Sequence, residues 1–157
     1  MNTHQHFLDR AVELGKIHMD TGAGGPFGAV IVRDGQIVAE GWNSVLADQD
    51  PTAHAEIVAI RRACRALGDF SLEGALLYSS CEPCPMCLAA IYWARLDGLY
   101  YAACQQDAAD AGFDDAYIYR ELSKPWPERA LKAEQGAADE ARRVFQLWCA
   151  KADKVQY

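Results

Sequence analysis

The chain has 157 residues, with 15 Lys and Arg against 22 Asp and Glu, which gives a formal net charge of −7 at pH 7. This length fits one domain, and 51% hydrophobic with 24% charged residues is typical of a globular protein, neither disordered nor fibrous. No apolar run approaches the roughly 20 residues of a membrane span, and residues 1–15 mix charged and apolar types too finely for a signal peptide. Because an acidic chain repels phosphate backbones, we expect a small-molecule ligand, with neither nucleic acid nor a membrane as partner.

Apolar spacing and turn residues predict alternating helices and strands. In chain order we expect a helix at 3–19, a hairpin of strands 29–32 and 36–41 around Asp34-Gly35, a helix at 51–67 capped by Asp50, a strand at 75–80, a helix at 85–95, a strand at 98–103, and helices at 114–121 and 128–150. A hairpin followed by alternating helix and strand is typical of a single α/β domain, in which a sheet lies between helices.

Cys81, Cys84 and Cys87 fall within seven residues of a chain that lacks an export signal. In a reducing compartment such as the cytoplasm, clustered cysteines are more often metal ligands than disulfides. The sulfurs of Cys84 and Cys87, three residues apart at a helix start, share a face where the helix N-terminus favours thiolates. Together with the imidazole of His54 they suit Zn²⁺, and three protein ligands leave the fourth position for water. We therefore expect one catalytic zinc ion per chain.

Glu56 lies two residues after His54 and so does not share its helix face. We expect its carboxylate to reach the bound water rather than to ligate the metal. The alternative is a closed structural site with Cys81 as a fourth ligand, serving protein contacts instead of catalysis. Such a site would explain neither Glu56 nor the proline that precedes Cys84.

The order His54-Ala55-Glu56, then Pro83-Cys84-Pro85-Met86-Cys87, matches the H-x-E…P-C-x-x-C signature of zinc nucleobase deaminases. The chain resembles the cytidine deaminase-like superfamily over nearly its whole length. Within it, the chain looks like the small bacterial guanine deaminases, through the segments GGPFGAVIV, DPTAHAE, SSCEPCPMCLAAIYWAR and AGFDDAYIY. The resemblance implies a three-layer α/β/α sandwich with a central mixed sheet of about five strands, formed by one zinc deaminase domain over residues 1–157.

The activity that the resemblance implies is zinc-dependent hydrolysis of guanine to xanthine and ammonia, with Glu56 as the proton carrier. A carboxylate only accepts hydrogen bonds, so an aspartate suits the N1–H and amino edge of guanine. The resemblance assigns this role, and that of a second proton carrier, to Asp115. Asp114 is the alternative, and either aspartate could instead cap the following helix.

Four further residues are placed around the purine by the same resemblance. Phe27 offers a ring for stacking, Asn43 can hydrogen-bond a base edge on both sides of its amide, Ala55 contributes backbone, and Trp93 lies over the base. The family also exchanges its last helix and tail between two subunits. We accordingly expect a homodimer that exchanges residues from about 128 to 157, with Tyr157 reaching the partner's pocket.

Two related activities share the zinc signature. A tRNA adenosine deaminase must bind a polyanion, which a net charge of −7 disfavours. Deamination of cytosine or cytidine is the other alternative within the same chemistry.

Overall fold

The computed structural model describes residues 3–157 of the chain. Its helical elements, in chain order, are α1 (Thr3–Asp20), α2 (Val45–Asp48), α3 (Ala55–Leu67), α4 (Pro85–Trp93), α5 (Gln105–Asp110), α6 (Asp115–Ser123), the 3₁₀ turn η1 (Trp126–Glu128) and α7 (Ala138–Ala150). Its strands are β1 (Gly28–Arg33), β2 (Gln36–Trp42), β3 (Ala75–Cys81) and β4 (Gly98–Ala103).

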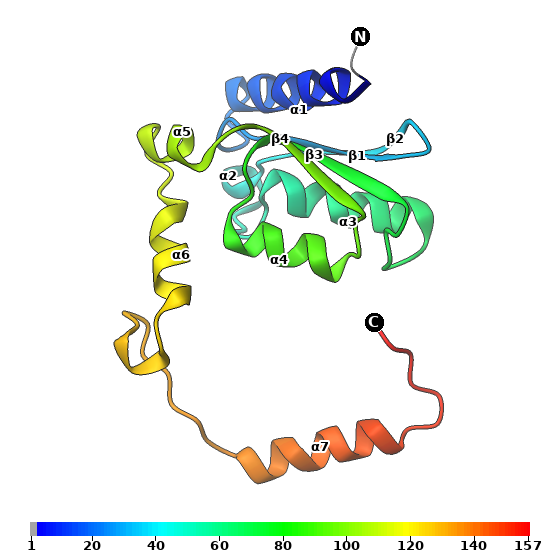
Figure 1. Cartoon of the computed structure of the whole chain (residues 1–157), viewed down its shortest axis with the longest axis vertical. Helices are drawn as coiled ribbons and strands as arrows, with labels where there is room; N and C mark the ends of the chain where they lie inside the picture. Colours follow the sequence, from blue (N-terminus) through cyan, green and yellow to red (C-terminus); the bar gives the residue numbers. More distant parts are fainter. Residues whose placement is uncertain (1–2) are drawn as a thin grey trace. The chain divides into compact units, whose positions relative to one another are not determined.

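The strands form one mixed sheet in the order β2-β1-β3-β4 (Figure 1). β1 runs antiparallel to both β2 and β3, whereas β3 and β4 are parallel. The hairpin between β1 and β2 turns at Asp34 and Gly35, whose φ angles are 52° and 74°. Both residues thus have the positive φ that a two-residue type I′ turn needs, which confirms the predicted hairpin.

Side chains alternate along the strands, so each face of the sheet has its own apolar layer. Val30 and Tyr78 pack with residues of α1 on one face, and Ile31 and Leu77 pack with residues of α3 and α4 on the other. Figure 1 shows α1 on one side of the sheet and α3 with α4 on the opposite side. The three-layer α/β/α sandwich is confirmed, with four strands in the described part of the chain instead of about five.

A close approach between β2 and α3 depends on Gly41. A Cβ atom at this position would lie 2.5 Å from the backbone nitrogen of Ala59 and 2.9 Å from its Cβ atom. Real Cβ atoms do not come so close to backbone, so a glycine is needed where the helix rests on the strand. This contact fixes the first two turns of α3 against the sheet.

The predicted start of α3 was four residues too early. The side chain of Asp50 does not cap this helix but closes a local turn, in which it accepts hydrogen bonds from the backbone nitrogen and the hydroxyl of Thr52. The helix begins at Ala55, and His54 is its N-cap residue. The short helices α2 and α5 carry too few residues for a periodic pattern and were not predicted.

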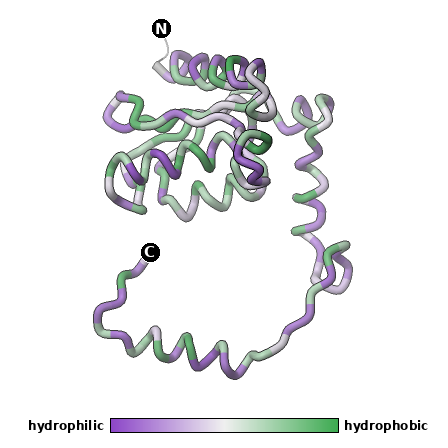
Figure 2. The backbone as a smooth tube through the Cα atoms, turned by 180° about the vertical axis from the view of Figure 1, so that it is seen from behind, coloured by the Kyte–Doolittle hydropathy of each residue, from purple (hydrophilic) through white to green (hydrophobic). Residues whose placement is uncertain are grey.

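The chain forms two compact units, Met1–Ile118 and Tyr119–Tyr157. In the second unit, the helix predicted over 128–150 is confined to α7. Along α7, hydrophobic and hydrophilic residues alternate (Figure 2), and Val144, Phe145 and Leu147 are exposed. In the part of the chain that the structure covers, no helix is both long and apolar enough to cross a membrane.

Candidate active site

Two helix starts bring the predicted metal ligands together. His54 is the N-cap residue of α3, and Cys84 is the N-cap residue of α4, both with extended backbone. Pro85 occupies the first helical position of α4, where its lack of an N–H has no cost. Cys87 lies in the same first turn, so its sulfur shares a helix face with that of Cys84.

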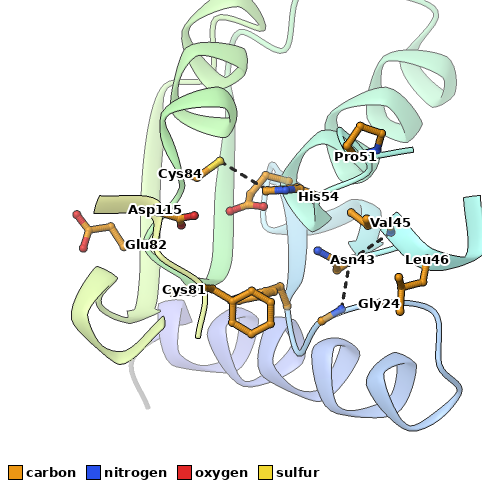
Figure 3. A pocket seen from close by; sticks show the side chains of 14 residues that line it. Gly24, Asn43, Val45, Leu46, Pro51, His54, Cys81, Glu82, Cys84 and Asp115 are labelled. Atoms are coloured by element: carbon orange, nitrogen blue, oxygen red, sulfur yellow. Dashed lines mark hydrogen bonds between the residues drawn. The ribbon is translucent and has the colours of Figure 1, made fainter. Parts of the chain in front are cut away.

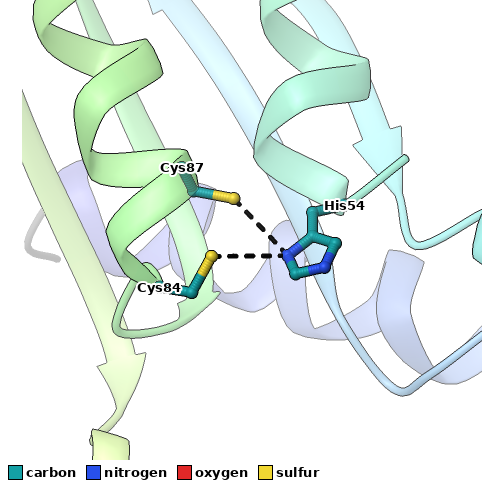
Figure 4. A group of neighbouring side chains, drawn as sticks. All are labelled: His54, Cys84 and Cys87. Atoms are coloured by element: carbon teal, nitrogen blue, oxygen red, sulfur yellow. Dashed lines mark hydrogen bonds between the residues drawn. The ribbon is translucent and has the colours of Figure 1, made fainter. Parts of the chain in front are cut away.

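The three side chains fit a zinc ion. The sulfurs of Cys84 and Cys87 each lie 3.6 Å from Nδ1 of His54 (Figure 4), and the three ligand atoms all lie within 4.8 Å of one another. Tetrahedral zinc, with bonds of about 2.3 Å to sulfur and about 2.0–2.1 Å to nitrogen, separates such ligands by about 3.6 Å. Cys84 and Cys87 are buried, and the donor set matches that of catalytic zinc sites with three protein ligands.

The two thiols have very different affinities for protons. Hydrogen bonds from Cys87 and from His54 lower the pKa of Cys84 to about 4, against the effect of burial. The pKa of Cys87 is raised, because a second thiolate would lie beside the first in a buried place. The bond to Cys84 in turn raises the pKa of His54. A divalent cation among these groups would relieve the repulsion between two thiolates.

Cys81 does not belong to the cluster formed by the side chains of His54, Cys84 and Cys87. Its sulfur donates to the backbone carbonyl of Cys104 at 3.7 Å, and burial raises its pKa to about 11. Among the described residues the cluster therefore has three ligands and not four. The structure does not form the closed site that would have used Cys81 as a fourth ligand.

Glu56 extends from the first turn of α3 into the interior beside the cluster. Its Oε1 atom accepts a hydrogen bond from Oγ of Ser79 at 3.2 Å, and its Oε2 atom lies 3.5 Å from the sulfur of Cys87. Burial is the largest effect on this carboxyl group and raises its pKa. A carboxyl group in this environment takes up and releases a proton closer to neutral pH than one in water.

A cavity of about 480 Å³ opens next to the cluster (Figure 3). Of the predicted site residues, it is lined by Phe27, Asn43, His54, Glu56, Cys84 and Asp115. The lining residues that were not assigned from the sequence are Gly24, Gly25, Val45, Leu46, Pro51, Cys81, Glu82 and Phe113. This volume is in the range of small-molecule sites in proteins.

The amide of Asn43 has only its NH₂ group left to offer to the cavity. Its Oδ1 atom accepts hydrogen bonds from the backbone nitrogens of Gly25 and Val45, both at 3.2 Å. Two N–H donors that face the same atom identify it as the oxygen. The NH₂ group points away from Val45 into the cavity (Figure 3), so Asn43 offers a donor there. The expectation that both sides of this amide could bind a base is wrong.

The two neighbouring aspartates have different roles in the structure. Oδ1 of Asp114 accepts a hydrogen bond from the backbone nitrogen of Tyr117 and so caps α6, as one alternative proposed. Asp115 instead lines the cavity, where its carboxylate is turned towards the side that holds Cys84 and His54 (Figure 3). Partial burial, and then the charge of Cys84, raise the pKa of Asp115.

Two aromatic rings form part of the cavity wall. Phe27 and Phe113 meet edge to face with ring centroids 4.8 Å apart, an arrangement that aromatic pairs prefer. Phe113 lies in the segment AGFDD that carried the resemblance, so its position next to Asp115 was a usable signal. Val45, Leu46 and Pro51 follow no periodic pattern, and the sequence held no comparable signal for them.

Five predicted site residues are not among those that line the cavity: Cys87 and Asp114, described above, and Ala55, Trp93 and Tyr157. Ala55 is the first, fully buried residue of α3, between His54 and Glu56. Trp93 is exposed at the end of α4, and Tyr157 belongs to the second unit. The roles given to these residues stay predictions.

Comparisons with known proteins agree with this geometry. Residues 1–103 match the family model described as the cytidine and deoxycytidylate deaminase zinc-binding region. The chain is 54% identical to guanine deaminase of Bacillus subtilis over 154 residues, which are 98% of this chain and 99% of that protein. It is 36% identical to tRNA-specific adenosine deaminase of Aquifex aeolicus over 141 residues, 90% of each protein.

Among solved structures, the X-ray structure of guanine deaminase from Bacillus subtilis matches with a TM-score of 0.96 and 54% identity. The match covers 100% of this chain and 99% of that one. Sequence, fold and metal-ligand geometry thus lead to the same assignment. The chain belongs to the deaminase family defined by the cytidine and deoxycytidylate deaminase zinc-binding region.

Proposed function

We propose that the protein hydrolyses guanine to xanthine, with one water consumed and one ammonia released per base. The observation that carries this proposal is a carboxylate, that of Asp115, in the cavity that also holds the zinc-type cluster and Glu56. The likeness to a guanine deaminase over nearly the whole of both chains supports the same substrate.

His54, Cys84 and Cys87 hold one zinc ion per chain in this proposal. Bound there, zinc supplies an open coordination position at which the pKa of water falls to about 7. The buried ligand set and the 3.6 Å separations support this assignment.

Glu56 carries the protons of the reaction. Its carboxylate accepts a proton from the attacking water and delivers it to a ring nitrogen as the C–O bond forms at the amino-bearing carbon. It then takes the proton of the hydroxyl group now on that carbon and supplies it to the amino group, which leaves as ammonia as the C–N bond breaks and the C=O bond of xanthine forms. Burial raises the pKa of Glu56, and a raised pKa favours the protonated form that the group must adopt between the two transfers.

Asn43 binds a hydrogen-bond acceptor of the base, and Asp115 binds its hydrogen-bond donors. Guanine donates at N1–H and at its 2-amino group, and the carboxylate of Asp115 accepts there. The NH₂ group of Asn43 donates to an acceptor of the base, while Phe27 and Phe113 provide aromatic contact. Ala55 and Trp93 would complete the contacts to the base.

This arrangement disfavours the alternative substrates. Adenine and cytosine each present a ring acceptor beside the amine, which would face the carboxylate of Asp115 without a proton between them. The net charge of −7 further disfavours a tRNA substrate.

We also propose a cytoplasmic homodimer, in which one deaminase domain per chain exchanges its segment from about residue 128 to 157. The exposed residues Val144, Phe145 and Leu147 of α7 support this, because an amphipathic helix is stabilised by packing its apolar face. Tyr157 would then enter the partner's pocket. Free cysteines at the metal site suit a reducing compartment.

Replacing Cys84 tests the metal site. Cys84→Ala removes one of three ligands, and we expect the purified protein to lose most of its zinc, as measured by elemental analysis. Cys81→Ala is the matched control, because this sulfur faces the carbonyl of Cys104, and it should keep the zinc content of the wild type. Equal zinc loss in both variants would indicate four ligands, and full zinc in Cys84→Ala would exclude the proposed set.

Glu56→Gln tests the proton carrier. Glutamine has the same shape but cannot shuttle protons, so kcat for guanine should fall by at least ~10²–10⁴-fold. Zinc content and thermal stability should stay close to those of the wild type. A variant that retains near-normal turnover would remove Glu56 from the mechanism.

Asp115→Asn tests base recognition. We expect kcat/KM for guanine to fall by at least ~10–100-fold, because the amide loses the charge that accepts from the donor edge. Asp114→Asn is the control, since Asp114 caps α6, and it should change kcat/KM by no more than a few-fold. If Asp114→Asn carries the larger loss, the neighbouring aspartate reads the base instead.

Removal of residues 154–157 tests the shared pocket. The truncated protein should keep its zinc and its dimeric mass in light scattering, yet lose guanine turnover because Tyr157 is absent. A monomeric wild type, or a truncated protein with full activity, would contradict the exchange.

A further inference from the structure

Ser79 is a buried polar residue that the proposed reaction does not use. It lies on β3, is 1% exposed, and pairs along the sheet with Ala29 on β1 and Tyr101 on β4. Alternation along β3 places its side chain on the same face as that of Leu77, which packs in the apolar layer below α3. A hydroxyl group in such a layer is tolerated only when it is hydrogen-bonded.

The hydrogen bonds of this hydroxyl have a definite direction. The backbone nitrogen of Cys81 lies 3.4 Å from Oγ of Ser79 and can only donate to it. Oγ of Ser79 lies 3.2 Å from Oε1 of Glu56, a carboxylate oxygen that accepts. The hydroxyl proton therefore points at Glu56, and the strand backbone holds it in that orientation.

Glu56 needs such a partner because its own torsions do not orient the carboxylate. The last torsion of a glutamate joins an sp³ to an sp² carbon and is broad, so the two oxygens exchange places easily unless they are bonded. Besides a hydrogen bond from its own backbone N–H, the carboxylate has a contact between its Oε2 atom and the sulfur of Cys87, which relies on a thiol proton. A metal-bound cysteine is a thiolate and has no such proton, so Cys87 cannot hold the carboxylate in the zinc-loaded protein.

We propose that Ser79 is the positioning residue for Glu56. Its hydroxyl binds Oε1 and so keeps Oε2 facing the side chains of His54, Cys84 and Cys87 for proton transfer. This inference rests on the proposed deamination. It assigns Ser79 no contact with the base or with the metal. Its loss should therefore lower kcat and leave KM and zinc content unchanged.

The variants Ser79→Ala and Ser79→Cys test this role. Alanine removes the donor, and we expect kcat for guanine to fall by ~10–100-fold, the effect of one hydrogen bond to a charged group. Cysteine is close in size and a weak donor, so its kcat should lie between those of the wild type and Ser79→Ala. KM should change by less than about threefold in both variants, and both should keep the zinc content of the wild type.

Ser80→Ala is the matched control on the same strand. Ser80 is also buried, but its hydroxyl accepts from the backbone nitrogen of Gly28 and does not reach Glu56. It should lower the melting temperature about as much as Ser79→Ala does, with kcat within about threefold of the wild type. If Ser79→Ala fails to fold, the comparison of Ser79→Cys with Ser80→Ala carries the same test.

A double-mutant cycle separates positioning from a structural role. In the Glu56→Gln background there is no carboxylate to orient, so Ser79→Ala should change the residual rate by less than about threefold. A folded, zinc-loaded Ser79→Ala enzyme with wild-type kcat would overturn the inference, as would an equal loss in both backgrounds. If the wild type leaves guanine unchanged, the proposed substrate fails, and the same cycle is measured on the base that it does deaminate.

Discussion

The imidazole Nδ1 atom of His54 lies 3.6 Å from the sulfurs of both Cys84 and Cys87, because α3 and α4 begin side by side. The rest of the site depends on the short distance between the N-terminal ends of α3 and α4. The pKa of the Cys84 thiol is lowered and that of the Cys87 thiol is raised, because two thiolates side by side in a buried place repel each other. The packing of α3 on β2 at Gly41 helps to fix one of these starts, so the fold builds a place where a divalent cation relieves electrostatic repulsion.

The residues around the cluster of His54, Cys84 and Cys87 have separate roles in the proposed reaction. Glu56 is buried beside the cluster of His54, Cys84 and Cys87, and Ser79 on the central strand β3 binds one of its oxygens; in the proposed reaction Glu56 transfers the protons. Asn43 and Asp115 come from loop and helix-start positions around the cavity and present a donor and an acceptor. In the proposed reaction, rigid elements thus hold the reacting groups, whereas the residues proposed to bind the base come from connecting segments, as is common in enzymes.

The cluster of His54, Cys84 and Cys87 was predictable because its members stand in two short motifs of the sequence. Cys84 and Cys87 stand three residues apart after a proline, and His54 precedes Glu56 by two, which are patterns of one helix start each. The alternating helices and strands and the hairpin followed from equally local signals, and the family resemblance supplied the layer arrangement. The start of α3 was misjudged because Asp50 has the same preference for a turn as for a helix cap.

What the sequence could not provide depends on contacts between distant segments. The donor state of Asn43 is set by two backbone nitrogens, one of them eighteen residues away at Gly25. The hydrogen bond between Ser79 and Glu56 joins a strand to a helix across 23 positions, and no spacing rule relates them. The difference between Asp114 and Asp115 also needed the three-dimensional structure, because both residues fit a helix start equally well.

The central claim is that this site deaminates guanine in preference to the other amino-bearing bases. The most direct measurement is the release of ammonia by the zinc-loaded wild type from guanine, adenine, cytosine and their nucleosides, with the product base identified by chromatography. We expect xanthine from guanine, with kcat/KM at least ~10–100-fold above that for adenine or cytosine. Equal or faster release of ammonia from adenine or cytosine would contradict it.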